Sequence, residues 1–217
     1  MAVRGWMTVI PVKRLDSAKS RLRGAVPHER HPELVLAMVR DTATAVLSAT
    51  SVADLIVVTD DPVVAQVVRE LGAKVAPDPG GGLNAALRFG ADEVVGLAGH
   101  RAVLTGDLPA LRPAQLDAAL AEARERSFVP DAAGTGTVLL TVPPRQPLDP
   151  RFGPRSAAAH QASGAIPLIG DWPGLRQDVD TAADLDTVLD LGAGERTRTL
   201  LSDLGLNRAC APAACAG

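Results

Sequence analysis

Short apolar runs alternate along this chain with longer stretches in which apolar residues recur at helical spacing. The runs are typical of buried strands, and the stretches that follow them are typical of amphipathic helices. In the first half of the chain, the predicted pairs of strand and helix are residues 6–12 and 27–49, 55–59 and 63–71, 74–76 and 84–97, and 102–105 and 114–126. This order predicts an α/β fold with right-handed crossovers and a mostly parallel sheet covered by helices on both faces.

The second half of the chain departs from this alternation. Adjacent β-like runs at residues 128–130 and 137–142 favour an antiparallel or edge addition to the sheet, and the proline-rich segment 143–154 favours a loop. A further strand is predicted at residues 166–169. Thr181, followed three residues later by an aspartate, resembles a capping box at the start of a last helix.

Composition and charge narrow the class of protein. A chain of 217 residues with 47% hydrophobic residues is long enough for one large α/β domain. The net charge of −3 gives no electrostatic reason to expect nucleic acid or an anionic membrane as partner, and the absence of tyrosine argues against base-stacking platforms. No apolar run of membrane-spanning length and no secretory leader is evident, so we expect a cytoplasmic protein.

The C-terminal end has a composition of its own. We expect one domain over residues 1–207 and a disordered, alanine-rich tail at residues 208–217. Both cysteines, Cys210 and Cys215, lie in this tail without a histidine or further cysteine at metal-binding spacing. The tail is therefore not expected to form a site.

Asp107 is the first candidate for chemistry. It closely follows the predicted strand at residues 102–105, and open α/β sheets bind ligands beyond the carboxyl ends of their strands. A carboxylate there suits a metal ion. An aspartate that only stabilises the turn before Pro109 explains the same residues, and this segment alone does not decide between the two.

Basic residues gather in the loop after the first strand. Lys13, Arg14, Lys19 and Arg21 follow one another within this loop. Lysine neutralises phosphate as a point charge and arginine binds two oxygens at once, so the group suits a polyphosphate. A solvated basic loop is the commoner alternative. The loop lacks the GxGxxG pattern of dinucleotide-binding dehydrogenases.

Two further segments suit a nucleotide and its metal. Three glycines at residues 80–82 lead into a predicted helix at Asn84, which lets the backbone approach a ligand, although an ordinary turn has the same composition. Asp178 and Asp180 face one way on an extended segment and could join Asp107 around Mg²⁺. The alternative is that they only cap the following helix.

These motifs, taken together and in order, resemble the phosphoenolpyruvate / 2-phospholactate guanylyltransferase family of deazaflavin coenzyme F-420 biosynthesis. The resemblance covers nearly the whole chain up to about residue 201 and rests on segments 9–13, 18–22, 82–84, 106–109, 130–131, 134–137, 152–156 and 178–181, with His160. It implies a single-domain nucleotidyltransferase fold related to the A-type glycosyltransferases, with a mixed sheet. It also implies GTP, Mg²⁺ and a three-carbon phospho-acid, for which this bacterial-looking composition favours phosphoenolpyruvate.

The resemblance also implies roles for particular residues. The residues expected to take part in catalysis and to bind the triphosphate are Asp107, Lys13 and Lys19, and those expected to bind the nucleotide are Lys13, Lys19, Arg21, Gly82, Leu83 and Asn84. The acceptor would be bound by Thr137, Gly153 and Ser156, and the metal ion by Asp107, Asp178 and Asp180. The acceptor residues also have structural interpretations, as a turn glycine, a strand threonine and a helix N-cap serine. His160 is expected in a helix after Ser156 and is given no role.

The expected reaction is in-line attack of the acceptor's phosphate on the α-phosphorus of GTP, with pyrophosphate as leaving group. Other acceptors remain open: 2-phospholactate, 3-phosphoglycerate, or a molybdopterin or sugar phosphate. The last two are disfavoured because the first loop lacks the glycine pair of those relatives. A non-catalytic nucleotide-sensing module is the more distant alternative. The downstream transferase that consumes the product is a further expected partner.

Overall fold

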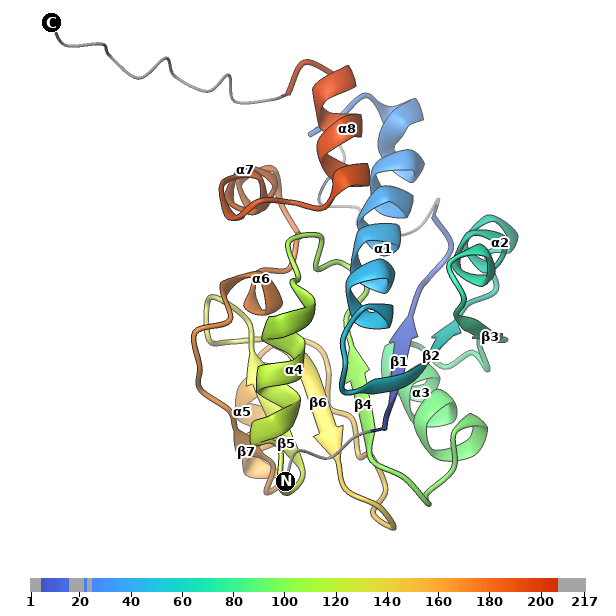
Figure 1. The fold of residues 1–217 in the computed structure, drawn as a ribbon, viewed down its shortest axis with the longest axis vertical. Helices are drawn as coiled ribbons and strands as arrows, with labels where there is room; N and C mark the ends of the chain where they lie inside the picture. The colour runs from blue at the N-terminus through green and yellow to red at the C-terminus, as the bar shows by residue number, and fades with distance from the viewer. Residues whose placement is uncertain (1–4, 16–21, 23–24, 207–217) are drawn as a thin grey trace, which may run out of the picture.

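Seven strands form one sheet at the centre of the molecule, in the order β3-β2-β1-β4-β6-β5-β7 (Figure 1). The computed structural model describes residues 5–15, 22 and 25–206. The strands are β1 (Trp6–Pro11), β2 (Val52–Val58), β3 (Lys74–Ala76), β4 (Arg101–Leu104), β5 (Ser127–Pro130), β6 (Thr137–Val142) and β7 (Ile166–Pro167). Lys19, Arg21 and the tail at 208–217 with its cysteines lie outside the described residues.

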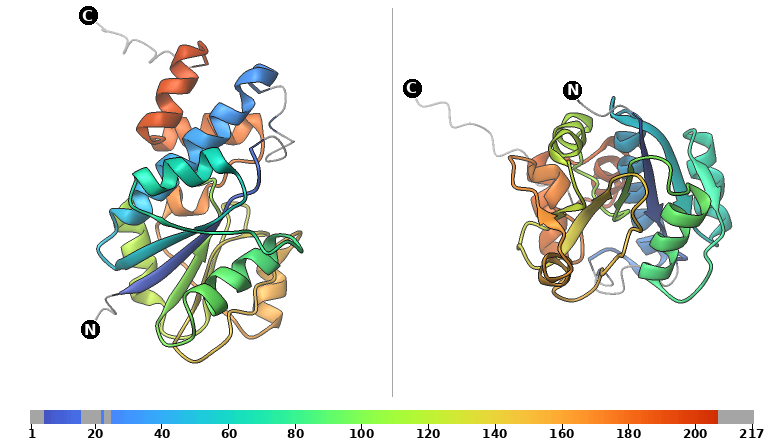
Figure 2. Two further views of the ribbon diagram at one scale, coloured as in Figure 1. Left: turned by 90° about the vertical axis from the view of Figure 1, so that its right-hand side faces the viewer. Right: turned by 90° about the horizontal axis from the view of Figure 1, so that it is seen from below.

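Helices cover both faces of the sheet. They are η2 (His28–Arg30), α1 (His31–Leu47), α2 (Pro62–Glu70), α3 (Leu83–Arg88), the π turn η3 (Phe89–Val94), α4 (Pro113–Glu122), α5 (Ser156–Ala162), α6 (Pro173–Arg176), α7 (Ala182–Leu191) and α8 (Glu195–Asp203). Figure 2 shows α3 on the opposite face of the sheet from α1 and α2. In the part of the chain described here, no helix is long and apolar enough to span a membrane.

The sheet is mixed, as the pattern predicts. Strands β3, β2, β1 and β4 run parallel to one another, whereas β6 is antiparallel to both of its neighbours, β4 and β5. The predicted antiparallel addition is therefore confirmed. Because β6 runs against β4, the amino end of β6 lies at the same edge of the sheet as the carboxyl end of β4.

Some elements differ from the prediction. The helix predicted at residues 84–97 consists of α3 followed by the π turn η3. Gly90 in this turn packs directly on the sheet, where an added Cβ would lie only 2.6 Å from Cγ1 of Val9. The strand predicted at 166–169 is limited to Ile166–Pro167, and the patterning did not predict α6 or α8.

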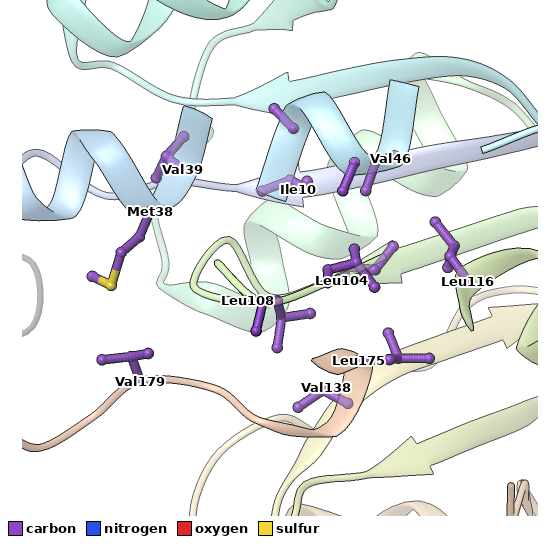
Figure 3. Close-up of a cluster of buried hydrophobic side chains, with 14 of the residues drawn as sticks. Ile10, Met38, Val39, Val46, Leu104, Leu108, Leu116, Val138, Leu175 and Val179 are labelled. Atoms are coloured by element: carbon purple, nitrogen blue, oxygen red, sulfur yellow. The ribbon is translucent and has the colours of Figure 1, made fainter. Parts of the chain in front are cut away.

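Two apolar clusters, one on each face of the sheet, make up the core. The larger joins β1, β4 and β6 to α1, α4 and the C-terminal helices, and Figure 3 shows part of it, including Ile10, Leu104 and Val138. The smaller lies under α3, η3 and α5 and contains Phe128 and Phe152. Both are built mainly from valine, leucine and alanine, as a composition with 2% aromatic residues requires.

A buried ion pair fastens η3 to the loop after β6. Arg101 is fully buried, and its guanidinium donates to the Asp92 carboxylate and to the carbonyl of Gln146. Asp92 also accepts from the Leu148 N–H at 3.2 Å. Burial lowers the pKa of Arg101, and the Asp92 charge opposes that shift. The charged Arg101 guanidinium is therefore stabilised in the core by the opposite charge of the Asp92 carboxylate.

Replacing Asp92 by asparagine should destabilise the protein strongly. The change leaves a buried guanidinium without its countercharge, for which we expect a loss of about 3–5 kcal/mol in the free energy of unfolding. Urea denaturation followed by circular dichroism measures it. Glu93→Gln, at the exposed next residue, is the matched control and should stay within about 0.5 kcal/mol of the original protein. Equal stability of the two variants would contradict this account of the pair.

Candidate active site

Asp107 lies in a turn that directly follows β4, and three hydrogen bonds join this turn to other parts of the chain. Leu108 N–H donates to Thr42 Oγ1 (3.0 Å), Val179 N–H donates to the Asp107 carbonyl (3.2 Å), and Gly194 N–H donates to the Pro109 carbonyl (2.7 Å). The turn is thus attached to α1 and to the segments that precede α7 and α8. Figure 3 shows Leu108 in the same apolar cluster as Met38 and Val179.

The segment with Asp178 and Asp180 lies beside this turn. Val179 is fully buried, whereas the two aspartates on either side of it are partly exposed. The bond between Val179 and Asp107 brings three carboxylate-bearing residues from distant parts of the sequence to one place. The side chains that cap α7 are those of Thr181 and Asp184, so neither Asp178 nor Asp180 supplies the cap itself.

Carboxylate oxygens of this kind are the ligands that Mg²⁺ prefers. Asp107, Asp178 and Asp180 fit the ion by their chemistry and by the proximity of their backbones. Among the described residues, however, no group of three or more His, Cys, Asp or Glu side chains has the arrangement of a metal site. Their role as metal ligands therefore stays a prediction.

A pocket of about 250 Å³ opens at the carboxyl edge of the sheet, next to Asp107. Its apolar wall comes from α1 and its polar end from the strand termini. The lining residues are Pro11, Val12, Lys13, Val35, Met38, Val39, Leu83, Thr105, Gly106 and Asp107. Lys13 also borders a second pocket of about 280 Å³, together with Asp60 and Asp78. The exposed Lys13 side chain thus lies between two adjoining cavities.

Asp61, which the sequence analysis missed, holds the loop that carries Lys13. Its carboxylate caps α2 by accepting from Val63 and Val64, and it also accepts from Leu15 N–H at 3.0 Å. Although burial acts to raise the pKa of Asp61, these backbone hydrogen bonds lower it below its usual value. The Asp61-Pro62 pair is a signal for a helix start, but nothing in the sequence indicates the bond to Leu15.

The glycine loop leads from the pocket toward the segment predicted to bind the acceptor. Gly80, Gly81 and Gly82 all have positive φ angles, of 78°, 81° and 88°, which side chains disfavour. Leu83 lines the pocket. The Asn84 amide instead binds the backbone of Phe152 twice, from Nδ2 to the carbonyl at 2.9 Å and from Phe152 N–H to Oδ1 at 2.8 Å.

The three predicted acceptor residues come from β6, from the loop before α5 and from the first position of α5. Thr137 begins β6, and the next residue's carbonyl accepts from Thr105 N–H at 3.1 Å, so Thr137 lies close to the Asp107 turn. Ser156 N–H donates to the Gly153 carbonyl at 3.1 Å. The interpretation of Ser156 as an N-cap is wrong, because Arg155 occupies that position with a left-handed φ of 56° and α5 begins at Ser156.

His160 is fully buried behind these residues. Its Nδ1 lies 2.9 Å from Thr137 Oγ1, and its Nε2 lies 2.9 Å from the backbone nitrogen of Arg151. Its ring packs on Phe128 and Phe152, with centroids 5.7 and 5.1 Å apart. The helix expected around His160 is confirmed, but its contact with Thr137 was not predicted.

Comparison with known proteins identifies the family of this sequence. The sequence matches the family described as guanylyl transferase CofC like over residues 6–212. The chain belongs to this family. The CofC-like relatives include phosphoenolpyruvate guanylyltransferases of Salinispora arenicola, 58% identical over 90% of this chain and 92% of the relative, and of Geodermatophilus obscurus, 52% identical over 93% and 96%.

Solved structures share the fold of this CofC-like chain at much lower identity. A nucleotidyl transferase from Methanothermobacter thermautotrophicus is 19% identical with a TM-score of 0.60, over 89% of this chain and 99% of that one. A CMP:2-keto-3-deoxy-manno-octonic acid synthetase complexed with CTP is 19% identical with a TM-score of 0.52, over 86% and 98%. The expected nucleotidyltransferase fold is confirmed.

Removing the Thr42 hydroxyl should loosen the Asp107 turn of this CofC-like protein. Thr42→Val leaves the buried Leu108 N–H without its acceptor, so we expect the free energy of unfolding to fall by about 1–3 kcal/mol. Thermal and urea denaturation measure the change. Thr42→Ser keeps the hydroxyl and loses one methyl group, worth about 0.8 kcal/mol. A larger loss in the serine variant than in the valine variant would refute the role of the hydrogen bond.

The pH dependence of stability should report on His160. Burial, together with the charges of Arg126 and Arg151 and against that of Asp149, lowers the pKa of His160 from 6.5 to about 4. Between these values the unfolded chain binds a proton that the folded chain does not. Stability should therefore fall as the pH drops from about 6.5 to about 4, by on the order of 3 kcal/mol.

Urea denaturation at intervals from pH 7 to pH 4 checks this expectation. His160→Gln should lack this component, so its loss of stability with pH should be smaller than that of the original protein. His28→Gln, at an exposed position, serves as control and should keep the original pH dependence. If His160→Gln also kept it, the buried imidazole would not be the responsible group.

Proposed function

We propose that this chain transfers GMP from GTP to the phosphate of phosphoenolpyruvate and releases pyrophosphate, as a step of coenzyme F-420 biosynthesis. One observation carries the proposal. Asp107 and the segment around Asp178 and Asp180 meet at the carboxyl edge of the sheet, beside a pocket that ends at Lys13. The names of the curated relatives, phosphoenolpyruvate guanylyltransferases at 58% and 52% identity, support the choice of both substrates.

The pocket offers apolar side chains for the base and ribose of a nucleotide and a basic side chain for its phosphates. Apolar side chains of Val35, Met38 and Leu83 offer a surface for the base and ribose, and Lys13, which also lines the pocket, would neutralise the triphosphate. Gly82, Leu83 and Asn84 would border the guanosine. Lys19 and Arg21, from the same basic loop as Lys13, would complete the neutralisation of the phosphates.

Asp107, Asp178 and Asp180 would hold Mg²⁺. When bound, the ion neutralises charge on the triphosphate and lowers the barrier to displacement at phosphorus. The protein's own part is to fix these carboxylates in place: the Asp107 turn is held by Thr42, and Val179 ties the second segment to it. The backbones of two chain segments that carry hard oxygen ligands therefore meet at one edge of the sheet.

The acceptor would be bound on the β6 side of the site. Thr137, Gly153 and Ser156 would hold its phosphate and carboxylate through hydroxyl and backbone N–H groups. A phosphate oxygen of the acceptor attacks the α-phosphorus of GTP in line, the bond to pyrophosphate breaks, and a guanosine diphosphate ester of the acid forms. No general base is needed, because a phosphate monoester dianion is already nucleophilic.

Pyrophosphate release by the purified protein with Mg²⁺ and GTP tests the proposal. We expect release with phosphoenolpyruvate and much less with 2-phospholactate or 3-phosphoglycerate. Asp107→Asn should lower kcat by at least about a hundredfold, because charge stabilisation at phosphorus is lost. Asp203→Asn, at an exposed position of α8, is the matched control and should leave kcat unchanged.

The other outcomes separate the alternatives. Pyrophosphate release with only 2-phospholactate or only 3-phosphoglycerate would support the guanylyl transfer reaction but show that this acid, and not phosphoenolpyruvate, is the acceptor. Binding of GTP, measured by calorimetry, without release with any of the three acids would refute this function. The chain would then transfer nucleotides to a molybdopterin or sugar phosphate, or would only sense GTP.

A further inference from the structure

A buried imidazole joins two parts of the proposed acceptor site. His160 on α5 contacts the Thr137 hydroxyl through Nδ1 and the Arg151 backbone nitrogen through Nε2, both at 2.9 Å. Thr137 belongs to β6, whereas Arg151 lies two residues before Gly153 in the loop that precedes α5. The side chain therefore connects the strand and the loop that together would hold the acceptor.

The chemistry of these two contacts determines where the imidazole proton lies. A backbone N–H can only donate, so Nε2 must accept with its lone pair. The ring is neutral at pH 7, since burial and the Arg126 charge lower the pKa of His160 to about 4. A neutral ring with an unprotonated Nε2 carries its proton on Nδ1 and donates it to Thr137 Oγ1.

This donation decides what the Thr137 hydroxyl can offer. An oxygen that accepts from the imidazole keeps its own proton for a different partner. Thr137 thereby becomes a directed hydrogen-bond donor, which suits a carboxylate or phosphate oxygen and does not suit a cation. Packing of the ring on Phe128 and Phe152 fixes the orientation of His160 and so that of the donor.

Asn84, on α3, holds the loop before α5 at the residue next to Arg151. Asn84, which follows the glycine loop, binds both the N–H and the carbonyl of Phe152. Two successive backbone N–H groups, those of Arg151 and Phe152, are thus bound by side chains from two helices immediately before Gly153. With φ of 138°, Gly153 adopts a backbone conformation that other residues rarely take.

We propose that His160 is a positioning residue for the acceptor, which orients the Thr137 hydroxyl as a donor and, with Asn84, fixes the backbone before Gly153. The ligand class is a small acid with a phosphate and a carboxylate. This inference rests on the proposed function, because it concerns the acceptor side of the same site. It assigns a role to a buried side chain that contacts both acceptor elements.

Two substitutions separate the two contacts of His160. In His160→Asn the amide nitrogen can replace Nδ1 as donor to Thr137, but the acceptor for Arg151 is lost. In His160→Gln the amide oxygen can replace Nε2 as acceptor for Arg151, but the donor to Thr137 is lost. We expect each variant to raise the KM for phosphoenolpyruvate about tenfold, the effect of one hydrogen bond, and to leave the KM for GTP within about twofold.

Combining each variant with Thr137→Val sharpens the test. His160→Gln should add almost nothing to the effect of Thr137→Val. The first loses the hydrogen bond that orients the Thr137 hydroxyl, and the second has already removed that hydroxyl. His160→Asn should add its full effect, because its loss lies at Arg151. His100→Gln is the matched control: His100 precedes β4 at the opposite edge of the sheet, so both KM values should be unchanged.

Imidazole ¹⁵N NMR supplies a readout that does not need turnover. The original protein at pH 7 should show His160 as the neutral tautomer with its proton on Nδ1, and titration with phosphoenolpyruvate should shift this signal. If no acid supports pyrophosphate release, the proposed function fails while the NMR titration still decides the positioning role. A proton on Nε2, an unshifted signal, or equal rises in both KM values would overturn the inference.

Discussion

The site depends on how closely the carboxyl end of β4 can approach β1 and still be held in place. At Gly106, two residues after β4, an added Cβ would lie only 3.1 Å from Cγ2 of Ile10, so the Ile10 side chain would have to shift to admit a larger residue. The next residues form the turn with Asp107, and the Thr42 hydroxyl accepts a hydrogen bond from the buried Leu108 N–H of this turn. A backbone turn that enters the core needs such a partner, because an unsatisfied buried N–H is costly. Gly106 and Asp107 line the pocket, and Val179, between the two aspartates, is bonded to Asp107. Thr105, just before the turn, is bonded to Val138 at the start of β6.

The elements could be predicted from the sequence to the extent that their signals are local. Apolar runs and helical spacing indicate β1 to β4 and the helices between them, and Thr181 marks the start of α7 because its capping box lies within four residues. Asp107 could be identified as a candidate because it follows a buried strand. The patterning did not predict α6, which has only four residues, or α8, although α8 buries Leu200 and Leu201 on one face. Packing against the rest of the protein stabilises helices this short.

The contacts that position the site could not be predicted in this way. Asp61 and Leu15 are 46 residues apart, and Asn84 and Phe152 are 68 residues apart, so no local pattern records their bonds. A lone histidine in a helix is most often structural, so the sequence alone assigns no role to His160. Only the antiparallel pairing of β6 with β4 shows that its partner, Thr137, lies at the same edge of the sheet as Asp107. Site geometry here follows from topology, which periodicity does not specify.

The reversed direction of β6 has a consequence for how such an enzyme can diversify. The residues around the pocket come largely from the parallel first half of the chain, whereas Thr137 and the loop before α5 come from the part that follows the reversal. The proposed nucleotide and acceptor sites therefore come from separate parts of the sequence and share one edge of the sheet. If the proposed site is right, substitutions after β5 would change which small acid is accepted, while the chain up to Asp107 would keep its nucleotide. Related enzymes could then vary one half of the chain without changing the other.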